Sequence, residues 1–435
     1  MSAKLVEEAR PTRFRVWVLA AMIAATFANY LDRAVLAVVG PTVQKEFGMS
    51  DVQYGWLSSA FVWGIVVVIL VFGVLMQKFG ERIVGFVGLI GFGLMTLLSG
   101  GTVGFKSLMA CRLGLGVFEA PTFPMNATLV RRWFPPTERA KSVSSYQFAA
   151  TCGTALGIPI VAGVTHAWGW RGAFVFAGAV TLLVSVFWRA VVHDTPQGAP
   201  RVNKTEVELI QAGGGEERSA GRTTREHVKY VLSDRRLIAL YIITGATSTA
   251  FFFFMTWLPK YMREAFDVDV TGGLRGGVKG TIPYLCALVG IVFGGWISDH
   301  LVARGVSRKH ARKVPIVIGL VLTAVVLVMP FAHGQLAGLV IISIGYFGAA
   351  MGNCAWILPA EVSRKECVAV ANSVYGFCTN LFGAISPVVA GYLVSLSGYN
   401  AMMVYIGAWA VVGLVSIVFV LDEVAPTPAK DEAAV

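Results

Sequence analysis

The stretch that decides the fold is VWVLAAMIAATFANYLDRAVLAVVG, residues Val16–Gly40. It is long enough to cross a bilayer as a helix, because the hydrocarbon core needs about 20 apolar residues. Only Asp32 and Arg33 place charge inside it. A charge at the centre of a membrane helix costs at least about 2.5–3.5 kcal/mol on insertion scales and is usually kept to move something charged. The stretch therefore predicts a membrane helix and favours a transporter of an ionised solute.

Composition excludes a water-soluble protein. Of 435 residues, 56% are hydrophobic and 14% charged, and the mean hydropathy is +0.68. The net charge of +11 follows the expected sides of the membrane, and no aromatic-basic interleaving indicates a nucleic-acid partner. The six cysteines show no CxxC spacing, so we expect neither a disulfide framework nor a zinc site. We also expect no other metal and no cofactor.

Apolar periodicity predicts an all-α membrane protein with twelve spans. They lie near 16–40, 53–76, 83–101, 107–129, 142–165, 171–191, 236–258, 277–298, 314–333, 336–359, 368–395 and 401–421. Basic residues follow the even-numbered spans, as Arg131 and Arg132 do after span four, which makes those loops cytoplasmic. Only 259–279, with Lys260, is basic on the opposite side. We expect a multi-pass protein of the cell inner membrane, functional as a monomer, with both termini cytoplasmic.

A polar stretch from His193 to Asp234, with glycines at 213–215, divides the spans into two groups of six. This predicts an N-terminal half at 1–191, a cytoplasmic linker at 192–235, and a C-terminal half at 236–435 with a short cytoplasmic tail. The halves echo each other, because the loop 135–139 after span four matches 359–364 after span ten. Duplicated halves that enclose a midplane site are a known transporter plan.

Three charged residues are expected to face one cavity. Helix geometry puts Arg112 at about the depth of Asp32 and Glu119 near the midplane. Arg112 and Glu119 are two turns apart, so they share a helix face. Asp32 and Arg33 diverge by about 100° on their helix and are poorly placed to pair. We therefore expect Asp32 to pair with Arg112, which leaves Arg33 for an incoming anion.

The residue types suit those roles. Arginine binds a carboxylate bidentately and stays charged at physiological pH. A buried carboxylic acid near a cation can change its protonation when substrate arrives or leaves, and Glu119 is the cleaner switch of the two acids. The alternative is a structural lock between helices made by Asp32, Arg112 and Glu119. Likewise, Pro121 and Pro124 mark either an ordinary kink or a polar site.

The string NYLDRAVLAV at 29–38, with Arg112 and GVFEAPTFP at 116–124, resembles the anion:cation symporter branch of the major facilitator superfamily. The similarity covers essentially the whole chain and implies a proton-coupled symporter that imports a small organic anion (a sugar acid, small diacid or aromatic acid) by alternating access. It implies proton-linked roles for Asp32 and Glu119 and a coupling role for Arg112. It also implies substrate contacts by Arg33, Tyr30 and Trp356.

The chain departs from the branch at several positions. The span-two tyrosine, span-five glutamine and span-eleven asparagine are Ile65, Ala150 and Gly376. Gln147 and Asn380 lie about one turn away and are either shifted substrate contacts or interhelical polar contacts. We therefore expect a substrate with fewer hydroxyls than a six-carbon aldonate. The usual acid after span two is Gln77, whereas its counterpart Asp299 is present and is expected to act in gating.

Other functions fit less well. A proton-driven drug or metabolite exporter is the alternative, because the stretch 153–159, GTALGIP, partly resembles an antiporter motif. Small residues at this spacing also serve close helix packing. An enzyme is not expected, because no histidine lies deep in a span beside a nucleophile or a second ligand. A transporter-like sensor needs a signalling domain, for which the tail 422–435 is too short.

Overall fold

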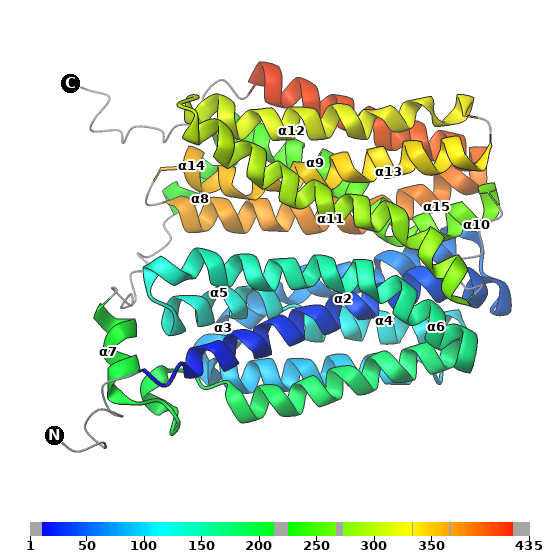
Figure 1. The fold of residues 1–435 in the computed structure, drawn as a ribbon. Coiled ribbons are helices and arrows are strands. Elements are labelled where there is room, and N and C mark those ends of the chain that lie inside the picture. The colour runs from blue at the N-terminus through cyan, green and yellow to red at the C-terminus, as the bar shows by residue number, and fades with distance from the viewer. Residues whose placement is uncertain (1–10, 213–224, 267–272, 333, 365–366, 421–435) are drawn as a thin grey trace. The chain divides into compact units, whose positions relative to one another are not determined.

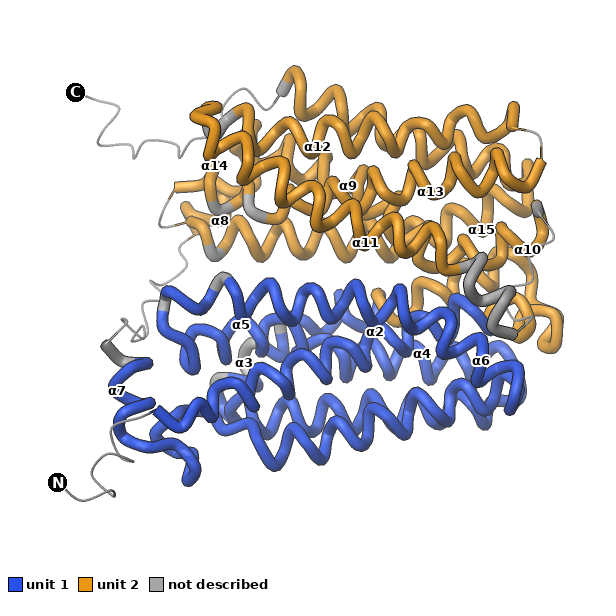
Figure 2. Tube along the Cα trace, viewed as in Figure 1, with its two compact units in different colours: residues 1–39, 63–219 blue, residues 40–62, 220–435 orange. Residues whose placement is uncertain are grey.

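The computed structural model describes residues 11–212, 225–266, 273–332, 334–364 and 367–420. The chain forms two compact units (Figure 2): unit 1 contains Met1–Val39 and Trp63–Ser219, and unit 2 contains Gly40–Val62 and Ala220–Val435. Unit 2 thus includes the hairpin formed by the end of the first span and the start of the second. The glycines at 213–215 lie outside the described residues.

The described residues are almost entirely helical (Figure 1). The first seven elements in chain order are α2 (Phe14–Glu46), α3 (Asp51–Ser99), α4 (Phe105–Glu119), α5 (Thr122–Trp133), α6 (Pro136–Val191), the 3-10 turn η1 (Pro196–Gly198) and α7 (Lys204–Ala212). The remaining elements are α8 (Arg225–Ser233), α9 (Arg235–Thr256), α10 (Leu258–Phe266), α11 (Gly273–Ala303), α12 (Arg308–Ala324), η2 (Val325–Phe331), α13 (Gln335–Met351), η3 (Gly352–Ile357), α14 (Leu358–Val362), α15 (Val368–Val415) and the π-helical turn η5 (Ser416–Val420).

Three of the long helices contain two membrane crossings each. They break at Gly80, Gly169 and Gly398, where φ is 79°, 71° and 73°, a conformation that glycine adopts without steric cost. After the first break, Asp194 caps the new helix by accepting a hydrogen bond from the Arg82 backbone N–H at 2.8 Å. A Cβ at Gly80 would lie 2.6 Å from that carboxylate.

The described residues contain nine helices long and apolar enough to cross a membrane. Two of the nine, Thr137–Val191 and Val370–Phe419, include a break and cross twice. Helices α4 and α5, each too short alone, together form one more crossing. The described chain therefore provides the twelve crossings that the sequence predicts.

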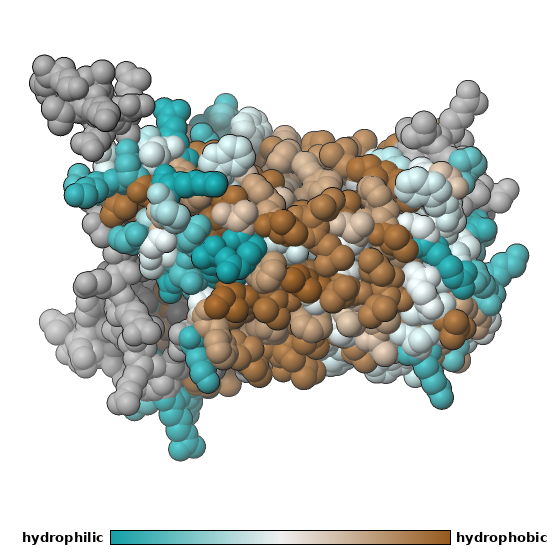
Figure 3. All heavy atoms as spheres, turned by 90° about the horizontal axis from the view of Figure 1, so that it is seen from below, coloured by the Kyte–Doolittle hydropathy of each residue, from teal (hydrophilic) through white to brown (hydrophobic). Residues whose placement is uncertain are grey.

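Apolar side chains cover the face shown in Figure 3 as a broad band, with hydrophilic residues toward both ends. Large exposed residues of unit 1 include Val67 at 73%, Leu183 at 71% and Val186 at 65%. Water does not favour such a surface, but lipid tails do. Beneath it, unit 1 has a core centred on Trp133 and Trp188, which are both fully buried.

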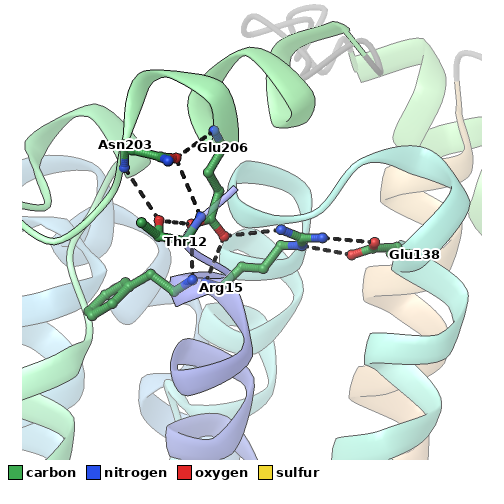
Figure 4. A network of polar contacts seen from close by, with 6 residues as sticks. Thr12, Arg15, Glu138, Asn203 and Glu206 are labelled. Carbon is green, nitrogen blue, oxygen red and sulfur yellow. Dashed lines mark hydrogen bonds and ion pairs between the residues drawn. The ribbon is translucent and has the colours of Figure 1, made fainter. Parts of the chain in front are cut away.

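A polar network fixes one end of unit 1 (Figure 4). Glu206, from α7 in the linker, accepts hydrogen bonds from the backbone N–H groups of Phe14 at 2.9 Å and Arg15 at 3.1 Å, at the start of α2. Arg15 also bonds Glu206 through Nη1 at 3.1 Å and Glu138 of α6 through Nε at 2.9 Å. Thr12 and Asn203 complete the network. The linker residues up to α7 are thus part of unit 1.

Lys260, the basic residue on the unexpected side, lies inside unit 2. Its side chain is 1% exposed and pairs with Asp51, which also accepts a hydrogen bond from Gln44 at 2.9 Å. Its ammonium lies 5.0 and 5.1 Å from the ring centres of Tyr54 and Trp257. This positive charge is therefore neutralised within unit 2 by the Asp51 carboxylate.

Candidate functional site

A buried ion pair joins α2 to α4 in unit 1. Arg112 Nη1 donates to Asp32 Oδ2 at 2.9 Å, and Thr96 of α3 donates to Asp32 Oδ1 at 2.9 Å. Asp32 is 0% exposed and Arg112 is 1% exposed. The guanidinium of Arg112 also lies 5.4 Å from the Phe174 ring centre. Both oxygens of the carboxylate are therefore bonded, and the partner of Asp32 is the one that the similar depth of the two residues predicts.

A second buried pair, between Arg33 and Glu119, lies one residue further along α2. The Arg33 guanidinium also stacks on Tyr30, 4.4 Å from its ring centre. Glu119 is 3% exposed, and its Oε2 atom has no hydrogen-bond partner among the described residues. The sequence reasoning leaves Arg33 for an incoming anion and misses this contact. Neighbouring residues that diverge by about 100° can each face a different carboxylate, but the sequence does not specify which carboxylate Arg33 meets.

The chain around Glu119 is interrupted by proline. Glu119 is the last residue of α4, and Pro121 caps the start of α5 with helical φ and ψ of −73° and −16°. Pro121 and Pro124 have no N–H, so the carbonyls one turn earlier, at Val117 and Ala120, lose their ordinary helix donors. The expected interruption is present at this carboxylate, but the dihedral angles keep the chain nearly continuous.

The other predicted contacts of unit 1 surround this centre unevenly. Tyr30 packs edge-on against Phe123, with ring centres 6.4 Å apart, and Phe123 packs against Tyr146 at 6.5 Å. Gln147 of α6 is exposed. Ala150 is buried at 5% exposure, so the position one turn away from Gln147 offers no polar group.

The predicted residues of unit 2 are held by its own helices. Trp356 lies on η3, is 49% exposed, and packs edge-on against Tyr375 at 5.2 Å between ring centres. Asn380 donates to the carbonyl of Gly376 at 2.9 Å, one turn back in α15, so one end of its amide is satisfied within its own helix. Asp299 of α11 pairs with Arg312 at 3.2 Å.

Arg312 links Asp299 to the segment 359–364 within unit 2. Besides Asp299, its guanidinium lies 3.3 Å from Glu361, in the segment after span ten that repeats the loop after span four. The side chain of Asp299 is 80% exposed. Among the described residues, no three His, Cys, Asp or Glu side chains gather as metal ligands.

A profile of the Major Facilitator Superfamily matches residues 22–307 and 277–435. The chain belongs to this superfamily. A probable galactarate/D-glucarate transporter GudP of Bacillus subtilis (strain 168) is 31% identical over 95% of this chain and 93% of its own length. The D-galactonate transporter of Escherichia coli O6:H1 is 29% identical over 96% of this chain and 98% of its own length. These relatives agree with the branch that the sequence motifs indicate.

A solved major facilitator structure shares the fold. A bacterial homologue of the human lysosomal transporter Spinster, inward-facing and unoccupied, superposes with a TM-score of 0.72 at 17% identity, over 94% of this chain and 95% of that one. At this identity, the likeness is one of fold alone. The family and its transporter relatives confirm the sequence predictions of a major facilitator fold and of a protein that is not an enzyme.

Proposed function

We propose that this protein is a proton-coupled symporter that imports an organic carboxylate across the cell inner membrane. The observation that carries the proposal is the Arg33–Glu119 pair. A guanidinium binds one carboxylate or another with the same donors. A substrate carboxylate at Arg33 therefore competes with Glu119 for the same cation.

This competition couples substrate to a proton. When substrate holds Arg33, Glu119 loses its cation while it remains buried, and a buried carboxylate without a partner favours the neutral, protonated form. When substrate leaves, Arg33 returns to Glu119 and the proton is released. In this proposal Arg112 and Thr96 stay bonded to Asp32 while Arg33 changes partner.

A sugar acid is the first substrate class to test. The printed names of the relatives, galactarate/D-glucarate and D-galactonate transporters, support it. Ile65 and Ala150 are apolar and at most 7% exposed, which supports the less hydroxylated substrate expected from the sequence. A pocket without polar partners leaves substrate hydroxyls unsatisfied. Uptake of galactarate, galactonate, tartrate and benzoate by one preparation distinguishes these classes.

The remaining assignments extend the proposal. Tyr30 positions Arg33 by stacking, while Gln147, Trp356 and Asn380 contact the substrate. Asp299 acts in gating through Arg312. The linker at 192–235 and both termini face the cytoplasm, and the monomer is the functional form.

The exporter alternative rests on the stretch 153–159. A Cβ added at Gly153 would lie 2.8 Å from the Phe27 carbonyl oxygen, and one at Gly157 would lie 2.9 Å from Ala34. Both glycines therefore allow α6 to pack closely on α2 within unit 1. This packing accounts for the small residues without an export function.

The test is uptake into proteoliposomes with an imposed inward proton gradient. We expect accumulation of galactarate, or of another carboxylate of the panel, to stop when an uncoupler collapses the gradient. Sodium is expected to have no effect. Accumulation that survives the uncoupler and requires sodium contradicts proton coupling. Efflux driven by proton entry favours the exporter.

A further inference from the structure

Two pairs of polar side chains join α2 to α5 inside unit 1. Asn29 donates to Thr122 at 3.1 Å, and Asn126 donates to Thr26 at 3.1 Å. All four side chains are buried, with exposures of 4% or less. The pairs lie one above the other, because each helix advances about one turn between its two members. We call Thr26, Asn29, Thr122 and Asn126 the polar seam.

The seam begins beside Glu119. Glu119 precedes Thr122 by about one helical turn and shares its face, and both line a narrow crevice with Asn29, Gly88 and Pro121. From there the seam continues along α5 toward Arg131 and Arg132, at the end proposed to be cytoplasmic. It is a row of polar side chains in an otherwise apolar contact between helices.

Two acceptor atoms in this region have no donor. Glu119 Oε2 and Asn126 Oδ1 are buried without a hydrogen-bond partner among the described residues. They are two turns apart along α4 and α5, or about 10 Å. The Ala120 carbonyl, which Pro124 leaves without its ordinary helix donor, lies on the turns between them. Ordered water is the usual donor to buried acceptors of this kind.

The crevice is too narrow for a water molecule in this conformation. A path that was always filled with water would connect Glu119 to solvent whether or not Arg33 held it. Coupling requires a path that opens only at one stage of transport. A closed row of polar groups with two unmet acceptors is consistent with such a path.

We propose that the polar seam is the route by which the proton of Glu119 leaves toward the cytoplasmic end, through water that enters when the crevice widens. The proposal rests on the proton-coupled function above. The protonated Glu119 gives its proton to the first water, each water passes one proton to the next, and the last releases it to solvent. Glu119 is left as a carboxylate and pairs with Arg33. The seam residues donate and accept hydrogen bonds without changing protonation.

The competing explanation is that the seam only holds two helices together, as interhelical polar contacts do. The variant Asn126→Leu distinguishes a structural seam from a proton route. Thr26 also donates to the Met22 carbonyl at 2.8 Å, so it keeps a partner when Asn126 is lost. The change removes an unmet buried acceptor and the hydrogen bond to Thr26, and leucine has the same number and branching of side-chain heavy atoms as asparagine. A purely structural seam thus predicts normal transport from a stable variant.

The experiment compares two modes of galactarate transport in proteoliposomes. Substrate exchange across the membrane needs no net proton release. Substrate accumulation driven by an inward proton gradient does need it. We expect Asn126→Leu to exchange galactarate like the unmodified protein and to accumulate it about tenfold more slowly, equivalent to roughly 1.4 kcal/mol in the barrier. A pH-sensitive dye inside the vesicles should report the same slowing of proton release.

Two further variants define the outcome. Gly88→Ala narrows the crevice without changing any side chain of the polar seam, because its Cβ would lie 3.0 Å from the Phe118 carbonyl oxygen. It should also slow accumulation and leave exchange unchanged. Ser386→Ala removes a buried interhelical hydrogen bond of 2.8 Å in unit 2. It should show no difference between its effects on exchange and on accumulation. The proposal is overturned if, in Asn126→Leu and Gly88→Ala, exchange and accumulation both keep the rates of the unmodified protein. It is also overturned if both modes are slowed to the same extent. If the unmodified protein accumulates substrate despite an uncoupler, proton coupling itself fails and the seam proposal fails with it.

Discussion

Arg33 donates to Glu119, so the residue expected to bind substrate and the residue expected to bind a proton are bonded to each other. The neighbouring pair, Asp32 with Arg112, has both carboxylate oxygens occupied, whereas Glu119 has one oxygen without a partner. The two pairs therefore differ, because only the Glu119 carboxylate keeps an oxygen that no donor occupies. Breaking the Arg33–Glu119 pair requires one new partner for each residue, and a substrate carboxylate together with a proton supplies both.

Replacement of Arg33 tests its role as a carboxylate ligand. Arg33→Ala should weaken substrate binding by about 2–5 kcal/mol, because a charge-assisted bidentate contact is lost. Arg33→Lys should restore only part of this, because an ammonium has no planar fork of donors. Binding is measured by calorimetry on the purified protein. Arg171→Lys, at an exposed arginine of α6, is the matched control.

The double variant Arg33→Ala/Glu119→Gln removes an ambiguity. Arg33→Ala alone leaves Glu119 without its cation, and that disturbance can weaken binding indirectly. Glutamine at 119 is neutral and needs no cation. Binding that remains weak in the double variant identifies Arg33 as the ligand, whereas recovery of normal binding assigns it a structural role.

Glu119→Gln tests the proton step. Glutamine resembles the protonated acid but cannot release a proton. We expect the variant to bind substrate and exchange it across the membrane, while accumulation driven by the proton gradient is lost. Counterflow and uptake are measured on the same vesicles. Normal accumulation would leave Asp32 as the carrier of the proton, and loss of binding would instead favour the structural lock.

Part of this centre follows from helix geometry alone. Similar depth predicts the contact of Asp32 with Arg112, and the two-turn spacing predicts that Glu119 shares the face of Arg112. The pairing of Arg33 with Glu119 is not predicted, because it depends on the rotation and tilt of α2 against α4. Those are set by close contacts such as Gly157 of α6 against Ala34, which a single sequence does not specify.

The number of spans can be predicted from the sequence, whereas the helix boundaries are predicted less accurately. Runs of about 20 apolar residues identify the spans, but α2 extends to Phe14–Glu46, beyond the predicted 16–40. Polar ends such as Lys45 continue a helix outside the hydrocarbon core at no cost, so hydropathy does not mark them. Burial of Lys260 is likewise invisible in the sequence, because its partner Asp51 is distant along the chain.

The Lys260–Asp51 pair gives a prediction about stability. Asp51→Asn leaves a cation that is 1% exposed without its main counterion and should destabilise the protein by up to about 3 kcal/mol. Glu264, at 3.8 Å, compensates in part. Lys260→Met should cost less, because it removes the buried charge and keeps the stem that packs on Tyr54 and Trp257. Thermal unfolding in detergent ranks the variants. Equal stability of Asp51→Asn and the unmodified protein would show that Glu264 alone is sufficient.

The polar network around Glu206 predicts how stability depends on pH (Figure 4). Burial by itself raises the pKa of Glu206, but hydrogen bonds from Thr12 and from the Phe14 and Arg15 backbone outweigh it, and the net pKa lies below the ordinary value of 4.5. A lowered folded-state pKa means that the unfolded chain binds more protons in this range. The contribution of Glu206 is therefore complete above about pH 4.5 and is lost as the pH falls through the lower folded-state value.

Glu206→Gln should lower stability by about 1–3 kcal/mol at neutral pH, because the amide keeps one acceptor oxygen but loses the charge that faces Arg15 and the start of α2. Glu138, the other acid near Arg15, is retained. The deficit should be constant from pH 5 to pH 8 and shrink below about pH 4.5. Melting temperatures across this range measure it against Glu208→Gln, the same change at an exposed position of α7. A deficit that grows between pH 5 and pH 8, or one that Glu208→Gln shares, would show that the network does not act through the Glu206 carboxylate.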